Sequence, residues 1–577
     1  MRSAPTLRVR WLGKVPYTEA ADLQQALHER SADDALLLLE HPHVYTLGTR
    51  ADPTHVLVPP ESVGADLVQT DRGGDVTYHG PGQLVGYPIV SLDAWRAGSF
   101  DVVAYVRRLE SVLIDALAEM GVRAGRDVGY TGVWVDGAKI AAIGVRVARG
   151  RTRHGFALNV DPDLTMFDHI VPCGITDRGV TSLAALGATT DMRTVVDAVT
   201  GGFTRHFPHL DVERQDVVWR HTPEDLSAFT VAAMAGGEPV PATPAGAPVR
   251  LLGRLAEAGV ETSPDPDFRR PPWMKVRADL GTGYRSTQRL MRSLDLNTVC
   301  EEAGCPNIYE CWADGTATFM ILGDRCTRAC GFCLVDTRHP EPLDPEEPER
   351  VARAVATLGL AHAVITCVAR DDLPDGGAGA FAATIRAVRH HAPETKVEVL
   401  ISDCHGDADA FATIAAARPD VLNHNLETVA RLQRAARPSA GYARSLAVLA
   451  RSKSAGLVTK SGIILGMGET DAEVRGALAD LRGVGVDIVT LGQYLRPSAR
   501  HLPVVRWWHP DEFVAIGAFA ESLGFAHVES GPLVRSSYHA RRGSEAARSA
   551  DRGPEGSREP VTGEWSRPAA GATRGGG

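Results

Sequence analysis

Apolar and polar positions follow two distinct patterns along the chain. In the first part, short apolar runs predict buried strands at residues 35–40 and 84–90. Between residues 100 and 120 the apolar positions recur at helical spacing, and Gly121 follows as a stop signal. Residues 132–147 contain two apolar runs around an Asp-Gly pair, which favours the tight turn of a hairpin. Mixed strands and helices predict an α/β or α+β domain built on a central sheet.

In the second part, strands alternate regularly with helices. The apolar runs predict strands at residues 316–323, 363–368, 397–402, 421–424, 459–466 and 488–494. Helical spacing predicts helices at residues 347–358, 379–390, 470–482 and 511–523. This alternation predicts a parallel sheet, and about six such units favour a partial (β/α)6 barrel over an open sheet. Ligands are then expected at the carboxyl ends of the strands.

Two stretches have the composition of segments outside a core. Residues 232–249 contain three Gly and four Pro in 18 residues, which is typical of a flexible linker. Residues 541–577 are rich in Gly, Arg, Ser, Glu and Ala. They cannot bury enough apolar surface to offset their ordering entropy, so we expect a disordered tail. The predicted domains are therefore residues 1–231 and 250–540.

Composition narrows the classes of function. At 577 residues the chain is too long for one core, and its 44% apolar and 23% charged residues are ordinary for a globular protein. The net charge of -10 argues against nucleic-acid binding, which needs a basic face. No run of 18 apolar residues predicts a membrane span, and no apolar stretch follows the first ten residues as in a secretory signal. Nine cysteines, six of them clustered, favour metal binding in a reducing cytoplasm over disulfides.

The clustered cysteines form two groups of three. The first group, on the loop expected after the strand at 316–323, is Cys326, Cys330 and Cys333. The second group, just upstream, is Cys300, Cys305 and Cys311. Three closely spaced thiolates can hold a 4Fe–4S cluster and leave its fourth iron open, which is the pattern of radical S-adenosylmethionine (SAM) enzymes. Two groups indicate two clusters. Structural zinc is the alternative, but zinc sites usually show C-x2-C pairs and four ligands.

The first part of the chain has its own candidate chemistry. Residues 71–82 combine small residues, which allow close approach of a ligand to the backbone, with Arg72 and His79, although a Gly-rich surface loop is the alternative. Cys173 is the only cysteine of this part. A lone cysteine is usually a small core residue, but Pro-Cys-Gly is typical of a turn that exposes the thiol. Lys139 lies just past the predicted hairpin turn and on its own indicates no more than a surface lysine.

Together these stretches resemble the lipoyl(octanoyl) transferase family, which has the fold of biotin/lipoate protein ligases. The similarity runs from about Trp11 to Phe207, through motifs at residues 72–83, 137–144, 154–159 and 172–174. The resemblance implies that Cys173 takes the octanoyl group as a thioester and that Lys139 is its partner. A nearby cation lowers the pKa of a thiol, and a lysine can pass protons to the leaving group.

The same resemblance implies an acyl pocket. Its expected lining residues are Arg72, Gly73, Gly74, Asp75, Val76, Thr77, Tyr78, His79, Ala142, Ile143, Gly144, Gly155, Phe156 and Ala157. An ATP-dependent lipoate or biotin ligase of the same fold is the alternative. Such an enzyme activates its acid as an adenylate and needs no nucleophilic cysteine, so the Lys139/Cys173 pair favours the transferase.

The second part closely resembles lipoyl synthase over nearly its whole length. The similarity is carried by motifs at residues 272–276, 298–307, 310–312, 326–333, 423–427, 460–466, 492–495 and 535–538. It implies that Cys326, Cys330 and Cys333 hold the cluster that binds SAM and reductively cleaves it. The resulting 5′-deoxyadenosyl radical abstracts hydrogen from C6 and C8 of a protein-bound octanoyl chain. Biotin synthase, another sulfur-inserting radical SAM enzyme, is the alternative, but the upstream cysteines and the Arg-Ser-Ser-Tyr motif at 535–538 argue against it.

Further site residues follow from this resemblance and from the predicted fold. An auxiliary cluster that donates both sulfur atoms is implied to be held by Cys300, Cys305, Cys311 and a serine, for which we favour Ser537 over Ser536. After the strand at 363–368, the segment that we expect to admit the amino acid portion of SAM is Asp375, Gly376 and Gly377. The family commonly has Ser and Asp near positions 367 and 369, where this chain has Cys367 and Ala369. We interpret Cys367 and Cys404 as structural or incidental thiols.

The two resemblances together predict a fusion of consecutive enzymes of lipoate biosynthesis. The first would move octanoyl from octanoyl-acyl carrier protein to a lysine of a lipoyl domain, and the second would insert two sulfur atoms into that group. The expected partners are lipoyl domains of 2-oxoacid dehydrogenases, the glycine cleavage H protein and a low-potential electron donor, with neither nucleic acid nor membrane. A flexible linker could hold both sites near one lipoyl domain and raise its effective concentration. The alternative is a first domain that only docks the substrate protein.

Overall fold

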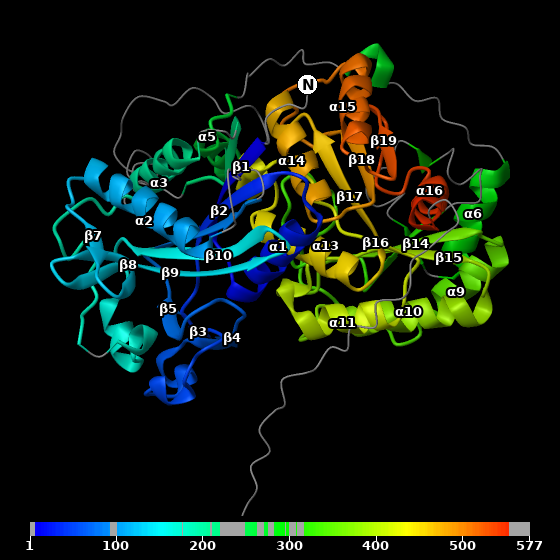
Figure 1. Ribbon diagram of the computed structural model, residues 1–577. Helices are drawn as coiled ribbons and strands as arrows, with labels where there is room; N and C mark the ends of the chain where they lie inside the picture. Colours follow the sequence, from blue (N-terminus) through cyan, green and yellow to red (C-terminus); the bar gives the residue numbers. More distant parts are fainter. Residues whose placement is uncertain are drawn as a thin grey trace, which may run out of the picture.

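The computed structural model describes residues 6–92, 101–175, 177–207, 211–219, 249–261, 270–274, 282–294, 296–298, 307–308 and 317–552. These residues form two α/β units that pack against each other (Figure 1). No helix in the described ranges is long and apolar enough to cross a membrane. The predicted linker at 232–249 lies outside these ranges except for Val249, where helix α5 (Val249–Glu257) begins.

The N-terminal unit is built on a mixed eight-stranded sheet of order β11-β1-β2-β6-β10-β9-β8-β7. Its strands are β1 (Thr6–Lys14), β2 (Asp34–Glu40), β6 (Gln83–Ile89), β7 (Gly125–Asp127), β8 (Tyr130–Val135), β9 (Ala138–Ala148), β10 (Arg151–Asn159) and β11 (Asp211–Asp216). A smaller sheet contains β3 (Val44–Leu47), β4 (Asp66–Gln69) and β5 (Val76–His79). The helices are α1 (Tyr17–Arg30), α2 (Val102–Glu119) and α3 (Met192–His206).

The predicted local signals of this unit are confirmed. Helix α2 begins after Asp101, whose carboxylate accepts a hydrogen bond from Val103 N, and Gly121 follows its end at a φ of 79°. The turn between β8 and β9 holds Asp136 and Gly137 at positive φ, as the hairpin prediction requires.

Strand β2 is apolar between its terminal residues Asp34 and Glu40 because both of its faces are covered. Successive side chains of a strand point to opposite faces of the sheet. Leu36 and Leu38 pack with residues of α2 and α3 on one face. Leu37 and Leu39 pack on the other face with α1 and with side chains of the C-terminal unit. The two units therefore share one hydrophobic core.

The C-terminal unit is a parallel sheet in which strand order follows chain order, with one short antiparallel strand at its edge. The strands are β12 (Asn297–Thr298), β13 (Thr318–Ile321), β14 (His362–Cys367), β15 (Lys396–Leu400), β16 (Val421–Asn423), β17 (Val458–Leu465), β18 (Ile488–Gln493) and β19 (His527–Ser530). The helices that connect them include α9 (Glu347–Leu358), α10 (Ala378–His391), α11 (Ala408–Ala416), α13 (Tyr442–Ser454), α14 (Asp471–Gly483) and α15 (Pro510–Ser522). The predicted parallel βα arrangement is confirmed, and β19 extends it by a strand that the sequence pattern did not indicate.

The expected boundary of the disordered tail is wrong. Residues 541–552 belong to helix α16 (Ala540–Arg552). Ala547 is 4% exposed and packs against Val421 and Ile488, while Arg548 pairs with Asp420. Small residues such as alanine bury little area but favour helix strongly, so composition alone underestimated this segment. The remainder, residues 553–577, lies outside the described residues.

A buried polar cluster joins the two units inside their shared core. The Arg10 side chain is 3% exposed, and its Nε donates to Oδ2 of Asp480 at 2.8 Å. The hydroxyl of Tyr442 donates to the same oxygen at 2.7 Å. Helix α1 lies against α13 beside this cluster (Figure 1). The position of the two units relative to each other is therefore set by packing between them as well as by the chain that connects them.

Removing the shared carboxylate should destabilise the protein. In Asp480→Ala, the buried guanidinium of Arg10 loses a partner, so we expect the free energy of unfolding to fall by about 3–5 kcal/mol. Urea denaturation followed by circular dichroism measures this loss. The control is Asp471→Ala on the same helix, which removes a half-exposed pair with Arg475 and should cost less than about 1 kcal/mol. Equal losses in the two variants would contradict the role of Asp480.

Candidate active sites

A cavity in the N-terminal unit brings together most of the predicted acyl-pocket residues. It is lined by Tyr17, Arg72, Gly73, Gly74, Asp75, Thr77, His79, Tyr87, Ala142, Ile143, Gly144, His154, Gly155, Phe156, Ala157 and Cys173. Val76 and Tyr78 are the exceptions among the expected residues. Side chains alternate along β5, so Thr77 and His79 face the cavity while Val76 and Tyr78 are fully buried in the core beneath the small sheet.

Cys173 lies on a tight turn, as its Pro-Cys-Gly sequence predicts. Its φ is 57°, which is uncommon for a residue with a side chain, and Gly174 follows at 69°. The turn is held by Val171 N, which donates to His55 O at 2.8 Å. Beneath it, Nδ1 of His55 lies 2.5 Å from Oδ2 of Asp75, and a Cβ at position 174 would come within 3.0 Å of that oxygen. The thiol is half-buried at the cavity wall.

The cation that the structure places in the cavity wall with Cys173 is Arg72. Its side chain is buried against Thr46, to which Nη2 donates at 2.8 Å. Burial lowers the pKa of Arg72, and the nearby Tyr17 and Cys173 act in the opposite direction. Lys139 does not line the cavity, and its ammonium lies 4.8 Å from the ring centre of Trp134. The partnership of Lys139 with Cys173 therefore stays a prediction.

Lys139 is nevertheless linked to the segment that follows the Cys173 turn. Its backbone N donates to Gly179 O at 2.9 Å, and Thr181 N donates to Lys139 O at 3.0 Å. The sequence reasoning missed Tyr17, Tyr87 and His154 as lining residues. Of these, His154 had a signal, since it opens the motif at 154–159.

Two histidines, His79 and His154, line this cavity, and burial lowers the pKa of both. Burial lowers the pKa of His79 well below its ordinary value, and the neighbouring His41 lowers it further. Its Nδ1 lies 2.8 Å from Oε1 of Gln83, which fixes the ring. His79 therefore offers the cavity a neutral imidazole rather than a charge.

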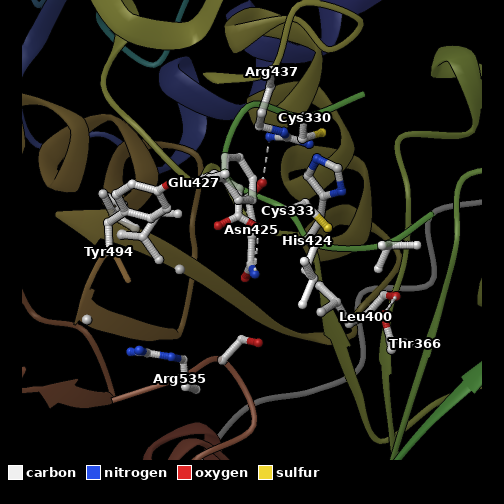
Figure 2. Close-up of a pocket in the computed structure, with 18 of the residues that line it drawn as sticks. Cys330, Cys333, Thr366, Leu400, His424, Asn425, Glu427, Arg437, Tyr494 and Arg535 are labelled. Atoms are coloured by element: carbon white, nitrogen blue, oxygen red, sulfur yellow. Dashed lines mark hydrogen bonds between the residues drawn. The ribbon is translucent and has the colours of Figure 1, made fainter. Parts of the chain in front are cut away.

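A larger cavity, of about 370 Å³, opens at the carboxyl ends of the strands in the C-terminal unit. Cys326, Cys330 and Cys333 all line it, as the predicted position after β13 requires. Figure 2 shows Arg437 close to Cys330 and Arg535 on the opposite side of this cavity. Two backbone groups, Ala369 N and Arg328 N, donate to Sγ of Cys326 at 3.3 and 3.4 Å. Such donors stabilise a thiolate.

The chemistry of these thiols fits an iron–sulfur cluster. Burial raises the pKa of Cys330 to about 12 and that of Cys333 to about 11, and the neighbouring thiols add to both shifts. Thiolate is the form that binds metal, and a bound cation supplies the positive charge that these thiols lack. Among the described residues, no three His, Cys, Asp or Glu side chains converge on a single metal-ion position. The three cysteines therefore stay predicted ligands.

The segment expected to admit SAM has a structural explanation in this chain. The carboxylate of Asp375 accepts hydrogen bonds from Gly377 N and Gly379 N at the start of α10. Gly376 packs against Cys404, and a Cβ at Gly377 would lie 2.3 Å from a methyl group of Leu322. These residues do not line the cavity. Their contact with SAM stays a prediction.

The auxiliary site can be described only in part. Ser536 lines the cavity, whereas Ser537 does not. Cys300, Cys305 and Cys311 lie outside the described residues, so the preference for Ser537 stays a prediction. The structure adds cavity residues that the sequence reasoning did not assign: Thr366, Asn425, Glu427, Arg437, Gln493 and Tyr494. Four of these had a signal, since Asn425 and Glu427 lie in the motif at 423–427, and Gln493 and Tyr494 lie in the motif at 492–495.

Comparisons with known proteins assign a family to each unit. The model of the lipoyl protein ligase A/B catalytic domain matches residues 16–204. The model of the N-terminal domain of lipoyl synthase matches residues 257–305, and that of the radical SAM superfamily matches residues 320–481.

Curated relatives match the C-terminal unit. The lipoyl synthase of Mycobacterium bovis is 56% identical over 295 residues, which are 51% of this chain and 95% of that protein. The lipoyl synthase of Mycobacterium avium is 56% identical over 289 residues, or 50% of this chain and 94% of that protein.

Solved structures match each unit at lower similarity. A bipartite lipoate protein ligase from Thermoplasma acidophilum has 17% identity and a TM-score of 0.30, over 39% of this chain and 92% of that one. A methylornithine synthase has 13% identity and a TM-score of 0.27, over 44% of this chain and 79% of that one. With its C-terminal half, the chain belongs to the lipoyl synthase family of the radical SAM superfamily, and it carries a lipoyl protein ligase A/B catalytic domain ahead of that half.

Proposed function

We propose that the chain is a bifunctional enzyme of lipoate biosynthesis. Its N-terminal domain transfers octanoyl from octanoyl-acyl carrier protein to a lysine of a lipoyl domain, and its C-terminal domain inserts sulfur at C6 and C8 of that octanoyl group. The observation that carries this proposal is the combination of a ligase A/B domain containing a cavity-lining Cys173 with a lipoyl synthase in one chain. The product of the first reaction is then the substrate of the second.

The transfer reaction uses the thiol of Cys173 as nucleophile. Its thiolate attacks the acyl carbon of octanoyl-acyl carrier protein, an Sγ–C bond forms, and the thiol of the carrier leaves with a proton. The lysine amine of the lipoyl domain then attacks the same carbon, the Sγ–C bond breaks, and the amine loses its proton. Arg72 lies in the wall of the same cavity as Cys173, and Lys139 is the proposed proton carrier. The apolar wall of Ile143 and Phe156 suits an alkyl chain.

An ATP-dependent ligase is the second candidate for this domain, because the matched family model describes lipoyl protein ligases. The position of Cys173 favours the transferase. A ligase that forms an adenylate has no use for a thiol held at a strained turn in the cavity wall. Purified chain supplied with octanoate and ATP but no acyl carrier protein tests this alternative, and octanoylation under those conditions would support the ligase.

In the C-terminal domain, Cys326, Cys330 and Cys333 would hold one 4Fe–4S cluster. Such a cluster, together with SAM, would supply radical chemistry able to remove hydrogen from unreactive carbon atoms. The chain itself contributes a cavity at the strand ends, with Arg437 and Arg535 on opposite sides. A second cluster, held by Cys300, Cys305, Cys311 and Ser537, is our proposed source of sulfur. Lipoyl domains of 2-oxoacid dehydrogenases, the glycine cleavage H protein and a low-potential electron donor are the proposed partners.

Loss of the Cys173 thiol should separate the two activities. In Cys173→Ala, octanoyl transfer from the acyl carrier protein should fall to the level of a reaction without enzyme, because no thioester can form. The same variant should still add sulfur to a lipoyl domain that was octanoylated beforehand. Intact-mass spectrometry of the lipoyl domain measures both reactions. If transfer survives in this variant, the thioester mechanism is wrong. If the first domain is inactive and only docks the substrate protein, the wild-type chain should also fail to transfer octanoyl.

Replacement of a ligand cysteine should remove one cluster. After anaerobic reconstitution, wild-type chain should contain about eight iron atoms and Cys330→Ala about four. The matched control is Cys367→Ala, which changes another thiol in the wall of the same cavity and should keep the wild-type iron content. Iron and sulfide analysis gives both values. A Cys330 variant with unchanged iron would refute its role as a ligand.

A further inference from the structure

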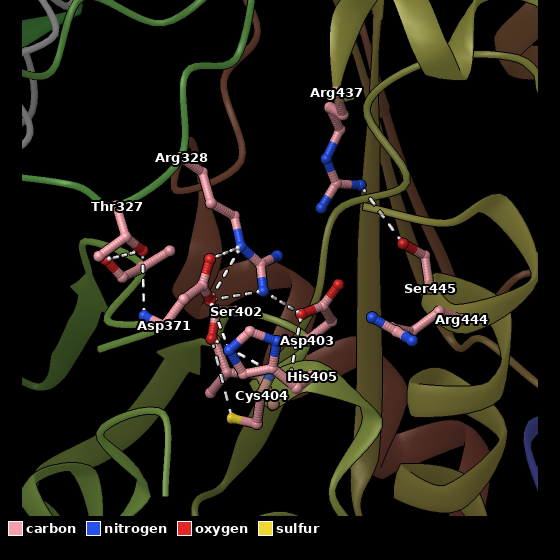
Figure 3. Close-up of polar contacts among 12 residues, drawn as sticks. Thr327, Arg328, Asp371, Ser402, Asp403, Cys404, His405, Arg437, Arg444 and Ser445 are labelled. Atoms are coloured by element: carbon pink, nitrogen blue, oxygen red, sulfur yellow. Dashed lines mark hydrogen bonds and ion pairs between the residues drawn. The ribbon is translucent and has the colours of Figure 1, made fainter. Parts of the chain in front are cut away.

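The loop that carries the three cysteines is held by a buried arginine. Arg328 lies between Cys326 and Cys330, and its side chain is 6% exposed. Its Nε and Nη2 donate to both oxygens of Asp371 at 2.8 Å each. Nη2 also donates to Oδ1 of Asp403 at 2.6 Å. Figure 3 shows the guanidinium between these two carboxylates. A planar guanidinium fixes two partners in defined directions, which an ammonium cannot do.

Other attachments hold the loop on either side of Arg328. Thr327 N and its hydroxyl both donate to Ala369 O at 2.9 Å, and Asp371 N donates to the Thr327 hydroxyl at 3.0 Å. These bonds tie the loop to the end of β14. Further along, Gly331 N donates to Ala436 O and Leu502 N donates to Gly331 O, both at 2.8 Å. Arg328 adds the link to the segment after β15, where Asp403 lies, so the position of its side chain depends on Asp403.

Asp403 belongs to a strained turn. The next three residues, Cys404, His405 and Gly406, have φ values of 43°, 54° and 76°. Residues with side chains adopt this left-handed region rarely, and surrounding contacts must hold them there. Inside the turn, Gly406 N donates to Asp403 O at 2.7 Å, and Nε2 of His405 lies 3.1 Å from Oδ1 of Asp371.

Arg451 of α13 holds the turn from outside, and both it and Arg444 of the same helix pair with helix α1 of the N-terminal unit. Nη1 of Arg451 donates to Gly406 O at 2.7 Å, and Nε of the same residue pairs with Asp22 of α1 at 2.5 Å. Nε of Arg444 pairs with Oε1 of Glu19, also on α1, at 2.7 Å. Glu19 is 4% exposed, and a Cβ at Gly406 would lie 2.5 Å from its Oε1. Position 406 therefore has no room for a side chain while Glu19 is in place.

We propose that Arg328 is a positioning residue for the cluster-binding loop and that Glu19 of the N-terminal unit acts on the same loop through the turn at 403–406. The C-terminal active site is then incomplete without a residue from the other catalytic unit. The proposal goes beyond the two activities and rests on the proposed ligand role of Cys326, Cys330 and Cys333. The iron content of Cys330→Ala tests that ligand role separately. Failure of the ligand assignment is therefore distinguishable from failure of the positioning proposal.

The first test compares Arg328→Lys with Arg338→Lys in the reconstituted full chain. Lysine keeps the charge but cannot join two carboxylates, so Arg328→Lys should release iron to a chelator roughly tenfold faster or more. The electron paramagnetic resonance spectrum of its reduced cluster should also respond less to added SAM. Arg338 is exposed and pairs with Asp336, and its variant should match wild type in both measurements. A wild-type release rate and spectrum for Arg328→Lys would overturn the proposal.

A milder variant keeps the test valid if Arg328→Lys fails to fold. Asp371→Asn removes one carboxylate at a half-buried position, and it should shift iron release and the SAM-dependent spectrum in the same direction. Circular dichroism establishes that the variant is folded. A folded Asp371→Asn with wild-type behaviour in both measurements would also overturn the positioning role.

The second test addresses the contribution of the N-terminal unit. Glu19→Gln removes the charge that pairs with Arg444, and we expect iron release to accelerate by roughly two- to thirtyfold, with a changed spectrum on SAM addition. The matched control is Glu29→Gln on the same helix, at a side chain that is 36% exposed. The control should behave as wild type. If Glu19→Gln and Glu29→Gln are indistinguishable, the N-terminal unit does not position the loop.

Discussion

The coverage of both faces of β2 is the constraint on which the rest of the structure depends. A strand that is buried on both faces needs a covering layer on each face, and α2 and α3 cover only one of the two. The other face is covered by α1, and the outer side of α1 is covered in turn by α13 of the C-terminal unit. The two units therefore pack as neighbouring layers of one structure rather than as independent domains joined by a flexible linker.

Helix α1 contacts the N-terminal cavity and the turn at 403–406. At its start, Tyr17 lines the N-terminal cavity, and two residues later, on the opposite side of the helix, Glu19 lies against Gly406 of that turn. Oε1 of Gln24 accepts a hydrogen bond from the backbone of His154, another residue of the N-terminal cavity. A displacement of this helix would alter the N-terminal cavity and the turn together. The packing of the units thus has a consequence for chemistry as well as for stability.

The sequence predicted the elements whose burial leaves a local pattern, and it missed those whose burial depends on distant partners. Strand β2 has a continuous apolar run, and the parallel strands of the C-terminal unit are rich in buried aliphatic residues, so their pattern was sufficient. Helix α1 has a weak apolar stripe because Glu19 and Gln24 are among its buried residues, and their partners lie far away in the chain. Strand β19 has one apolar residue among four half-buried positions. The cavity residues Tyr17 and Tyr87 have no local signal for the same reason.

The shared core also affects how the protein is made. The apolar face of α1 is synthesised early, but α13, which covers it, ends at Ser454, roughly 240 residues after β11 completes the N-terminal sheet at Asp216. At ribosomal rates the uncovered face waits roughly 12–50 s for its partner. During that interval the nascent N-terminal unit exposes Leu23 and its neighbours, which are fully buried in the finished protein. Because both units belong to one chain, α13 is tethered close to the exposed face of α1 as soon as it is synthesised. Two separately translated enzymes would lack this advantage.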